Sequence, residues 1–261
     1  MKISHEVPFC LLEKSREFND YDYCLPHLLD QSEEYKNFFY ESKKQGRYIV
    51  MDNSLHELGV AYDKSRLLFW INELKPNEFI VPDVWEDKAA SCRNAKQWAS
   101  ISLPEEVLKV AVVQAKSIHE AILCTQAYKD LGYKKIAYSY GASYYNEVCP
   151  HPNKDFGKAI GRFMVINEMY QSGMLSKHDR VHLLGTAWPS EFGCYKDIKC
   201  IESIDTSNPI MAGIEGRRYD GLGIPVKPLA NMNRLQDTYL DSIDLNIIEH
   251  NIKQFRKINE L

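Results

Sequence analysis

Short apolar runs alternate with amphipathic segments along the chain, and this alternation constrains the fold more than any other feature. The clearest runs are 47–51, 78–81, 109–114, 135–140, 180–185 and 201–204, and two weaker ones, 7–12 and 22–25, precede them. Runs such as Val-Ala-Val-Val lack polar alternation, which is typical of parallel strands covered on both faces. The pattern therefore predicts eight parallel strands.

The segments between these runs have helical spacing. They cover residues 33–44, 64–73, 89–100, 117–131, 156–172 and 245–258. Eight strands with crossover helices in 261 residues predict an α/β protein with a (β/α)8 TIM-barrel fold. An open doubly wound sheet is the alternative, although the chain has no Gly-x-Gly-x-x-Gly turn after its first strand. With no linker or internal repeat, residues 1–261 are expected to form a single domain.

Charge and cysteine content exclude several classes of protein. With 32 basic and 36 acidic residues, the net charge of −4 argues against a protein that coats nucleic acid non-specifically. No apolar run approaches the length of a membrane span, and no signal peptide is apparent, so we expect no membrane association and a cytoplasmic location. The seven cysteines include no Cys-x-x-Cys pair, so reduced structural thiols are expected, with no metal site.

Polar residues follow the predicted strands at the end where a barrel carries its chemistry. Asp52, Asp83, Gln114 and Asp205 each end an apolar run, and a fifth run ends in Ser139-Tyr140-Gly141. A single aspartate at such a position often caps the next helix. Three carboxylates around one pocket would repel one another, a cost usually tolerated only where acid, base or nucleophile chemistry requires it. The sequence therefore predicts an active site at these strand ends.

Five motifs, in order, resemble those of tRNA-guanine transglycosylases over strands three to eight. They are Tyr-Ile-Val-Met-Asp52, Ile-Val-Pro-Asp83, Val-Ala-Val-Val-Gln114, His182-Leu-Leu-Gly185-Thr-Ala-Trp-Pro189 and Ile-Glu-Ser-Ile-Asp205. The resemblance implies a base-exchanging enzyme, a glycosyltransferase that uses no cofactor. It assigns Asp205 as the nucleophile that forms a covalent bond with the sugar, and Asp52 as the general acid and base.

The resemblance also implies a binding site for guanine or a 7-deazaguanine base. Asp83 and Gln114 would bind the base, because a carboxylate accepts from its N–H donors while an amide both donates and accepts. Ser139, Tyr140 and Gly141 would line the same pocket.

Three features differ from the family pattern. The family's Asp-Ser-Gly-Gly turn is replaced by Asp52-Asn53-Ser54-Leu55, and Ser139 and Tyr140 replace two glycines. The family's zinc subdomain, which supports tRNA docking, is absent, since no cysteine follows Cys200. The resemblance therefore favours DNA as the nucleic-acid partner, as in related DNA-modifying transglycosylases, with a free 7-deazaguanine such as preQ0 as the incoming base.

Basic residues after the eighth strand are candidates for phosphate binding. Arg217, Arg218 and Lys227 follow the end of the predicted strand that carries Asp205. Ordinary solvated charge explains them equally well.

Two other functions stay open at the level of the sequence. One is an N-glycoside hydrolase of a nucleoside, nucleotide or nucleic acid, built on the same barrel with water as the acceptor. The other is a barrel that binds nucleic acid without catalysis, although retention of all three aspartates argues against it. The identity of the incoming base and the oligomeric state are not determined by the sequence.

Overall fold

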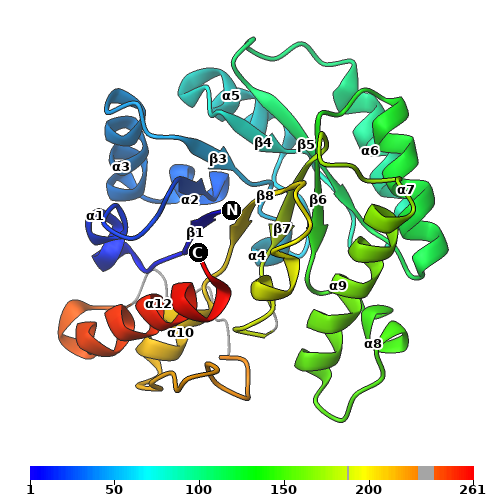
Figure 1. Cartoon of the computed structure of the whole chain (residues 1–261). Helices are drawn as coiled ribbons and strands as arrows, with labels where there is room; N and C mark the ends of the chain where they lie inside the picture. The colour runs from blue at the N-terminus through cyan, green and yellow to red at the C-terminus, as the bar shows by residue number, and fades with distance from the viewer. Residues whose placement is uncertain (187, 229–237) are drawn as a thin grey trace. The chain divides into compact units, whose positions relative to one another are not determined.

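Eight short strands alternate with helices along the chain (Figure 1). The computed structural model of the chain describes residues 1–186, 188–228 and 238–261. The strands are β1 (Lys2–Ser4), β2 (Asp22–Cys24), β3 (Ile49–Met51), β4 (Glu78–Ile80), β5 (Leu108–Val113), β6 (Lys135–Ser139), β7 (Arg180–Leu184) and β8 (Ile201–Asp205). The sheet has the order β1-β8-β7-β6-β5-β4-β3-β2. This nearly closed arrangement of parallel strands is a (β/α)8 TIM-barrel-like fold, which confirms the fold class predicted from the sequence.

The long helices lie where helical spacing predicts them. They are α3 (Glu33–Lys44), α5 (Lys64–Leu74), α6 (Lys88–Ala99), α7 (Ile118–Asp130), α9 (Lys154–Gln171) and α12 (Leu245–Asn259). Each begins at a capping side chain that accepts a backbone N–H bond, and these caps are Ser32, Asp63, Asp87, Ser117, Asn153 and Asp244. Such caps satisfy N–H groups that have no partner within the helix, so the sequence itself marks where the helices start.

Shorter helices occupy the connections. They are α1 (Leu12–Ser15), α2 (Pro26–Gln31), α4 (Leu55–Leu58), α8 (Tyr145–Val148), α10 (Asn208–Ile214) and the 3-10 turns η1 (Phe9–Leu11), η2 (Phe192–Tyr195) and η3 (Leu240–Ser242).

The first strand lies earlier than the sequence predicts. β1 is Lys2–Ser4, and the expected strand at residues 7–12 is wrong, because this segment forms η1 and the start of α1. Pro8 has no N–H group to donate to a sheet, and its carbonyl accepts a hydrogen bond from the Leu11 N–H at 2.9 Å. The proline therefore starts a helical turn instead of a strand.

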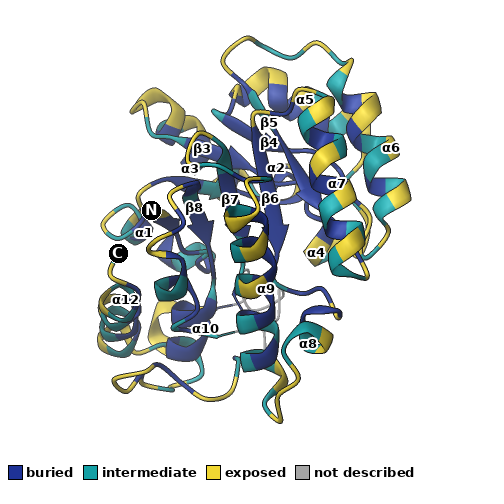
Figure 2. Ribbon diagram, turned by 45° about the vertical axis from the view of Figure 1, so that its right-hand side comes forward, coloured by how far each residue is buried: buried dark blue, intermediate teal, exposed yellow. Residues whose placement is uncertain are grey.

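The chain divides into two compact units. Residues 20–139 and 179–182 form one, which we call the central unit, and residues 1–19, 140–178 and 183–261 form the terminal unit. In the central unit every residue of β3 and β4 is buried, and α6 and α7 carry their exposed residues on the side away from the strands (Figure 2). The Phe79 and Trp98 rings, 5.0 Å apart, pack α6 against β4. Burial on both faces explains why these strands read as continuous apolar runs.

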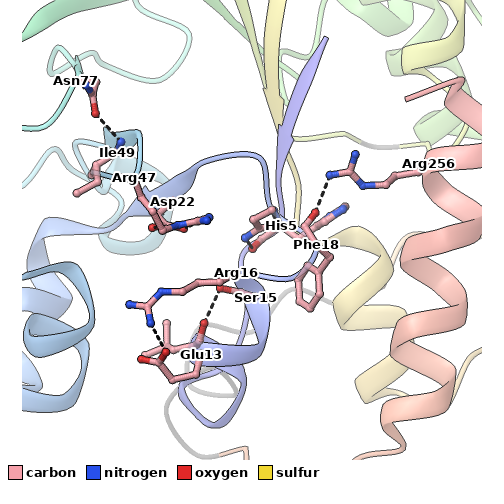
Figure 3. A network of polar contacts seen from close by, with 12 residues as sticks. His5, Glu13, Ser15, Arg16, Phe18, Asp22, Arg47, Ile49, Asn77 and Arg256 are labelled. Carbon is pink, nitrogen blue, oxygen red and sulfur yellow. Dashed lines mark hydrogen bonds and ion pairs between the residues drawn. The ribbon is translucent and has the colours of Figure 1, made fainter. Parts of the chain in front are cut away.

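A buried ion cluster lies at the amino ends of the strands in the central unit. Glu78 Oε1 accepts hydrogen bonds from Lys135 Nζ at 2.8 Å, Tyr48 Oη at 2.6 Å and Arg180 Nη2 at 3.3 Å. The side chains of Glu78 and Lys135 are both 1% exposed. Nearby, Arg47 makes a paired contact with both carboxylate oxygens of Asp22 (Figure 3). These contacts hold β2, β3, β4, β6 and β7 at the end opposite the predicted active site.

The terminal unit has its own core. α10 packs on α12 so closely that a Cβ atom on Gly213 would lie 2.4 Å from Ile248 Cγ1. Phe255 packs edge-on against His5, and Arg256 Nη2 donates to the Phe18 carbonyl at 2.6 Å (Figure 3). The last helix is thereby bound to the segment that follows β1.

Candidate active site

Asp83 is a buried carboxyl group that follows β4. Its Oδ1 atom accepts a hydrogen bond from Asn53 Nδ2 at 2.7 Å, and its Oδ2 atom accepts one from Gln114 Nε2 at 2.6 Å. Burial, with a contribution from the charge of Asp52, raises the pKa of Asp83 to about 7, although the two amide hydrogen bonds oppose the shift. Near neutral pH this side chain therefore exchanges readily between its charged and protonated forms.

Gln114 follows β5 and is fixed at both ends of its amide. Nε2 donates to Asp83, and Oε1 accepts from the Glu86 backbone N–H at 3.0 Å. Glu86 reaches this position with a left-handed φ of 49°. The structure thus brings together Asp83 and Gln114, the two residues expected to bind the base, and it sets which end of the amide faces the carboxyl group.

Asn53 links the two strand ends that carry Asp52 and Asp83. Its Nδ2 atom donates to the Val81 carbonyl at 3.1 Å as well as to Asp83, and its Oδ1 atom accepts from the Leu55 N–H at 2.9 Å. The sequence interpretation did not include Asn53 among the site residues. Its position directly after a strand-end aspartate was the available signal.

Both carboxylate oxygens of Asp52 accept hydrogen bonds. Tyr23 Oη donates to Oδ1 at 3.1 Å, and the Ser54 N–H donates to Oδ2 at 2.8 Å. Ser54 has a left-handed φ of 61°, a backbone conformation that a serine adopts at some cost in energy.

Two histidines contact the residues that donate hydrogen bonds to Asp52. His27 Nδ1 is 2.8 Å from Ser54 Oγ, and burial lowers the pKa of His27 to about 4. The His182 ring stacks nearly parallel on Tyr23, with the ring centroids 6.4 Å apart. A neutral His27 and a stacked His182 therefore support Ser54 and Tyr23, the two residues that contact Asp52.

Ser139 also belongs to the central unit. It ends β6 and is buried. Tyr140, Gly141, Asp205, Arg217, Arg218 and Lys227 belong to the terminal unit.

Asp205 is the last residue of β8 and is buried. Its backbone pairs with Ser4 of β1, and its Oδ1 atom accepts a long hydrogen bond, 3.4 Å, from the Gly185 N–H after β7. Gly185 has a left-handed φ of 61°, and a Cβ atom there would lie 2.4 Å from Tyr140 Cδ1. Only glycine suits this position, and it lets the backbone pass between Asp205 and the Tyr140 ring.

Tyr140 and Gly141 each contact a lysine. Lys227 Nζ lies over the Tyr140 ring, 4.0 Å from its centroid, and is hydrogen-bonded to the phenol oxygen. Lys158 Nζ donates to the Gly141 carbonyl at 3.1 Å. Lys227, expected to bind phosphate, thus faces an expected base-pocket residue.

A buried ion pair supports the loop beside Asp205. Arg162 Nε donates to Glu191 Oε1 at 2.7 Å, and the two side chains have no exposed surface. The Arg162 guanidinium also donates to the carbonyls of Leu184 at 2.9 Å and Gly185 at 2.7 Å. Arg162 and Glu191 were absent from the sequence interpretation, since an arginine in an amphipathic helix is usually exposed.

The two expected phosphate-binding arginines already have partners. Arg217 Nη1 is 3.1 Å from Glu215 Oε2, and its Nη2 atom donates to the Val226 carbonyl at 2.5 Å. Arg218 Nη2 lies 3.1 Å from His250 Nδ1 and is exposed. Arg218 is therefore the more accessible of the two.

Within residues 1–186, 188–228 and 238–261, no cluster of three or more His, Cys, Asp or Glu side chains could hold a metal ion. Over the same residues, no helix combines the length and apolar character needed to cross a membrane.

The sequence matches no protein-family model and no curated protein.

Proposed function

We propose that the protein is a base-exchanging transglycosylase that replaces guanine in nucleic acid, with DNA favoured, by a 7-deazaguanine such as preQ0. The observation that carries this proposal is the buried Asp83 carboxyl group with its two amide partners. Groups with a strongly shifted pKa, buried at the carboxyl ends of barrel strands, are typical of active sites.

The polar atoms around Asp83 match the edge of a guanine base. Asp83 accepts one hydrogen bond from each of two amide side chains, and a carboxylate has about four acceptor positions, so it can still accept from the N1–H and N2–H groups of guanine. The Gln114 Nε2 group has a second N–H available to donate to O6. A pKa near 7 lets the carboxyl group bind in its charged form when these donors arrive.

The exchange itself uses the two other aspartates in separate roles. The Asp205 carboxylate attacks C1′ of the sugar, and guanine leaves with a proton supplied by Asp52. The incoming 7-deazaguanine then gives a proton to Asp52 and displaces Asp205 from the sugar. Tyr23 and the Ser54 N–H hold Asp52 for this proton transfer.

A nucleic-acid substrate also requires contacts outside the base. Arg218 and Lys227 are the residues proposed to contact phosphate, and Ser139, Tyr140 and Gly141 to line the base pocket. A cytoplasmic location is part of the same proposal, as the sequence leads us to expect.

Base incorporation tests the proposal directly. The purified protein is incubated with a guanine-containing DNA oligonucleotide, or with tRNA, together with labelled guanine or preQ0. Transfer of label into the oligonucleotide is the expected result, and Asp205→Asn should abolish it. Asp197→Asn, which changes an exposed aspartate in the segment before β8, is the matched control and should retain activity.

Two outcomes would contradict base exchange. Free guanine with an abasic site, and no incorporated label, would assign the protein as an N-glycoside hydrolase. Tight binding of the oligonucleotide with neither product would indicate a nucleic-acid-binding barrel without catalysis.

A further inference from the structure

Two cysteines from neighbouring helices meet on the outer side of β5. Cys92 lies in α6 and Cys124 in α7, and their sulfur atoms are 3.7 Å apart. The two helices pack directly against each other. Cys124 is fully buried, whereas Cys92 is partly exposed. A small reagent can therefore reach Cys92, while Cys124 can be reached only through its partner.

The surroundings make Cys92 the more reactive thiol. The hydrogen bond with Cys124 lowers the pKa of Cys92 to about 7, and the positive charge of Lys88 adds to this effect. The pKa of Cys124 is raised, by the same hydrogen bond and by burial. Because the thiolate is the reactive form, Cys92 reacts first and Cys124 is left as a neutral thiol beside it.

The pair also lies next to the candidate active site. The backbone N–H of Gln114 acts on the Cys124 sulfur and favours its thiolate form. Thr125 follows Cys124 in α7, and its Oγ1 atom is hydrogen-bonded to Tyr138 Oη at 2.8 Å. Tyr138 directly precedes Ser139 in β6. Oxidation of Cys124 would therefore alter a contact of Gln114, the residue whose side chain donates a hydrogen bond to Asp83.

We propose that Cys92 and Cys124 form a peroxide-sensitive dithiol that closes to an intramolecular disulfide. The Cys92 thiolate attacks the O–O bond of a hydroperoxide, which forms a sulfenic acid and releases hydroxide or alkoxide. Cys124 then attacks the sulfenic sulfur and releases water as the S–S bond forms. The two thiols lose two electrons and two protons, and the peroxide is reduced to water and its alcohol, or to two water molecules for hydrogen peroxide.

Peptide mapping of the native protein tests this proposal without any mutation. The reduced protein is exposed to a few equivalents of hydrogen peroxide, blocked with iodoacetamide and digested with trypsin. The cleavage sites at Lys88, Arg93, Lys116 and Lys129 release the two cysteines on separate peptides, 89–93 and 117–129. We expect these peptides joined, lighter than their sum by two hydrogens, and separated again by a reductant.

Variants identify the order of the two steps. Cys92→Ser should abolish the linked peptide. Cys124→Ser should leave a sulfenic acid at Cys92, trapped by dimedone, because the second thiol is missing. Cys149→Ser, which removes another partly exposed thiol, is the control and should not change the yield.

Either of two results in the wild-type protein would overturn the proposal. One is oxidation of Cys92 to a sulfinic acid with no linked peptide. The other is a linked pair that involves a different cysteine. The proposal does not depend on the transglycosylase activity, so loss or absence of that activity leaves this experiment unchanged.

Discussion

A carboxyl group buried as deeply as Asp83 makes the stability of the protein depend on pH. Its pKa is near the ordinary value of about 4 in the unfolded chain and about 7 in the folded protein. Between these values the folded state binds the extra proton. The free energy of unfolding should therefore fall as pH rises through this range, by up to about 1.4 kcal/mol per pH unit. Asp83→Asn cannot ionise and should remove this part of the slope.

Urea denaturation across this pH range measures the effect of Asp83. Asp197→Asn is the control, because that aspartate is exposed and should leave the slope as in the wild type. An Asp83→Asn protein with the wild-type slope would show that another group controls the pH dependence.

The two catalytic roles proposed for Asp205 and Asp52 separate in single variants. Asp205→Asn should form no covalent adduct with an oligonucleotide, because an amide is a poor nucleophile. Asp52→Asn should still bind the substrate, but its rate of guanine exchange should be at least about a hundredfold below that of the wild type. A loss of this size is the usual scale of general acid and base catalysis. Denaturing gels report the adduct, and labelled guanine reports the exchange. Adduct formation by Asp205→Asn would move the nucleophile to another residue, with Asp52 the next candidate.

At the scale of elements, the turn after β7 depends on Gly185. Gly185→Ala should destabilise the protein by about 2–4 kcal/mol, because a left-handed φ strains alanine and the new methyl group meets the Tyr140 ring. Gly173→Ala is a matched control in the same unit. Its φ of 79° is also left-handed, but no atom lies within 4 Å of the added Cβ, so only the strain of about 1 kcal/mol remains.

Denaturation curves of the two alanine variants give the comparison. Equal losses of stability would mean that the Tyr140 ring moves aside freely, and that the close approach does not fix the turn.

The buried ion cluster is the corresponding element-scale feature at the amino ends of the strands. Glu78→Gln should cost about 3 kcal/mol or more, because it leaves the Lys135 ammonium buried without a countercharge. The double variant Glu78→Leu with Lys135→Met should recover much of this loss, since apolar side chains replace both charges. Thermal and urea unfolding would measure both.

Glu73→Gln provides the control for the ion cluster. Glu73 is exposed, so the stability of the Glu73→Gln protein should stay within about 0.5 kcal/mol of the wild type. If the double variant proves less stable than Glu78→Gln alone, the cluster contributes more than charge neutralisation.

At the scale of the whole molecule, the repeating pattern of strands and helices was predictable from the sequence. β3 and the Val-Ala-Val-Val segment of β5 are continuous apolar runs because they are buried on both faces, and such runs are visible without a structure. β1 was not predictable, because Lys-Ile-Ser contains a single apolar residue and therefore no apolar run marks the strand. The short helices α2, α4, α8 and α10 make at most two turns, so they show no clear helical period.

The candidate site was predictable only in part. Asp83 and Gln114 could be expected to lie close together, because they follow adjacent parallel strands. Asn53 contacts Asp83 through a side chain whose direction depends on the turn after β3, and Tyr23 reaches Asp52 from the neighbouring strand β2. Arg162 meets Glu191, 29 residues later in the chain, inside a core that a sequence pattern does not specify. Strand ends can thus be read from periodicity, whereas the residues that hold them in place cannot.

The pairing of β1 with β8 has a consequence for synthesis on the ribosome. His5, just after β1, is hydrogen-bonded to Thr206, just after β8, and the two residues are 201 positions apart. In the described sheet β8 is the only strand beside β1. During synthesis β1 therefore has no partner strand until β8, some 200 residues later in the chain, has been translated. Over that interval the apolar Ile3 side chain lacks the strand beside which it packs in the folded protein, and pairing over so long a sequence separation slows folding.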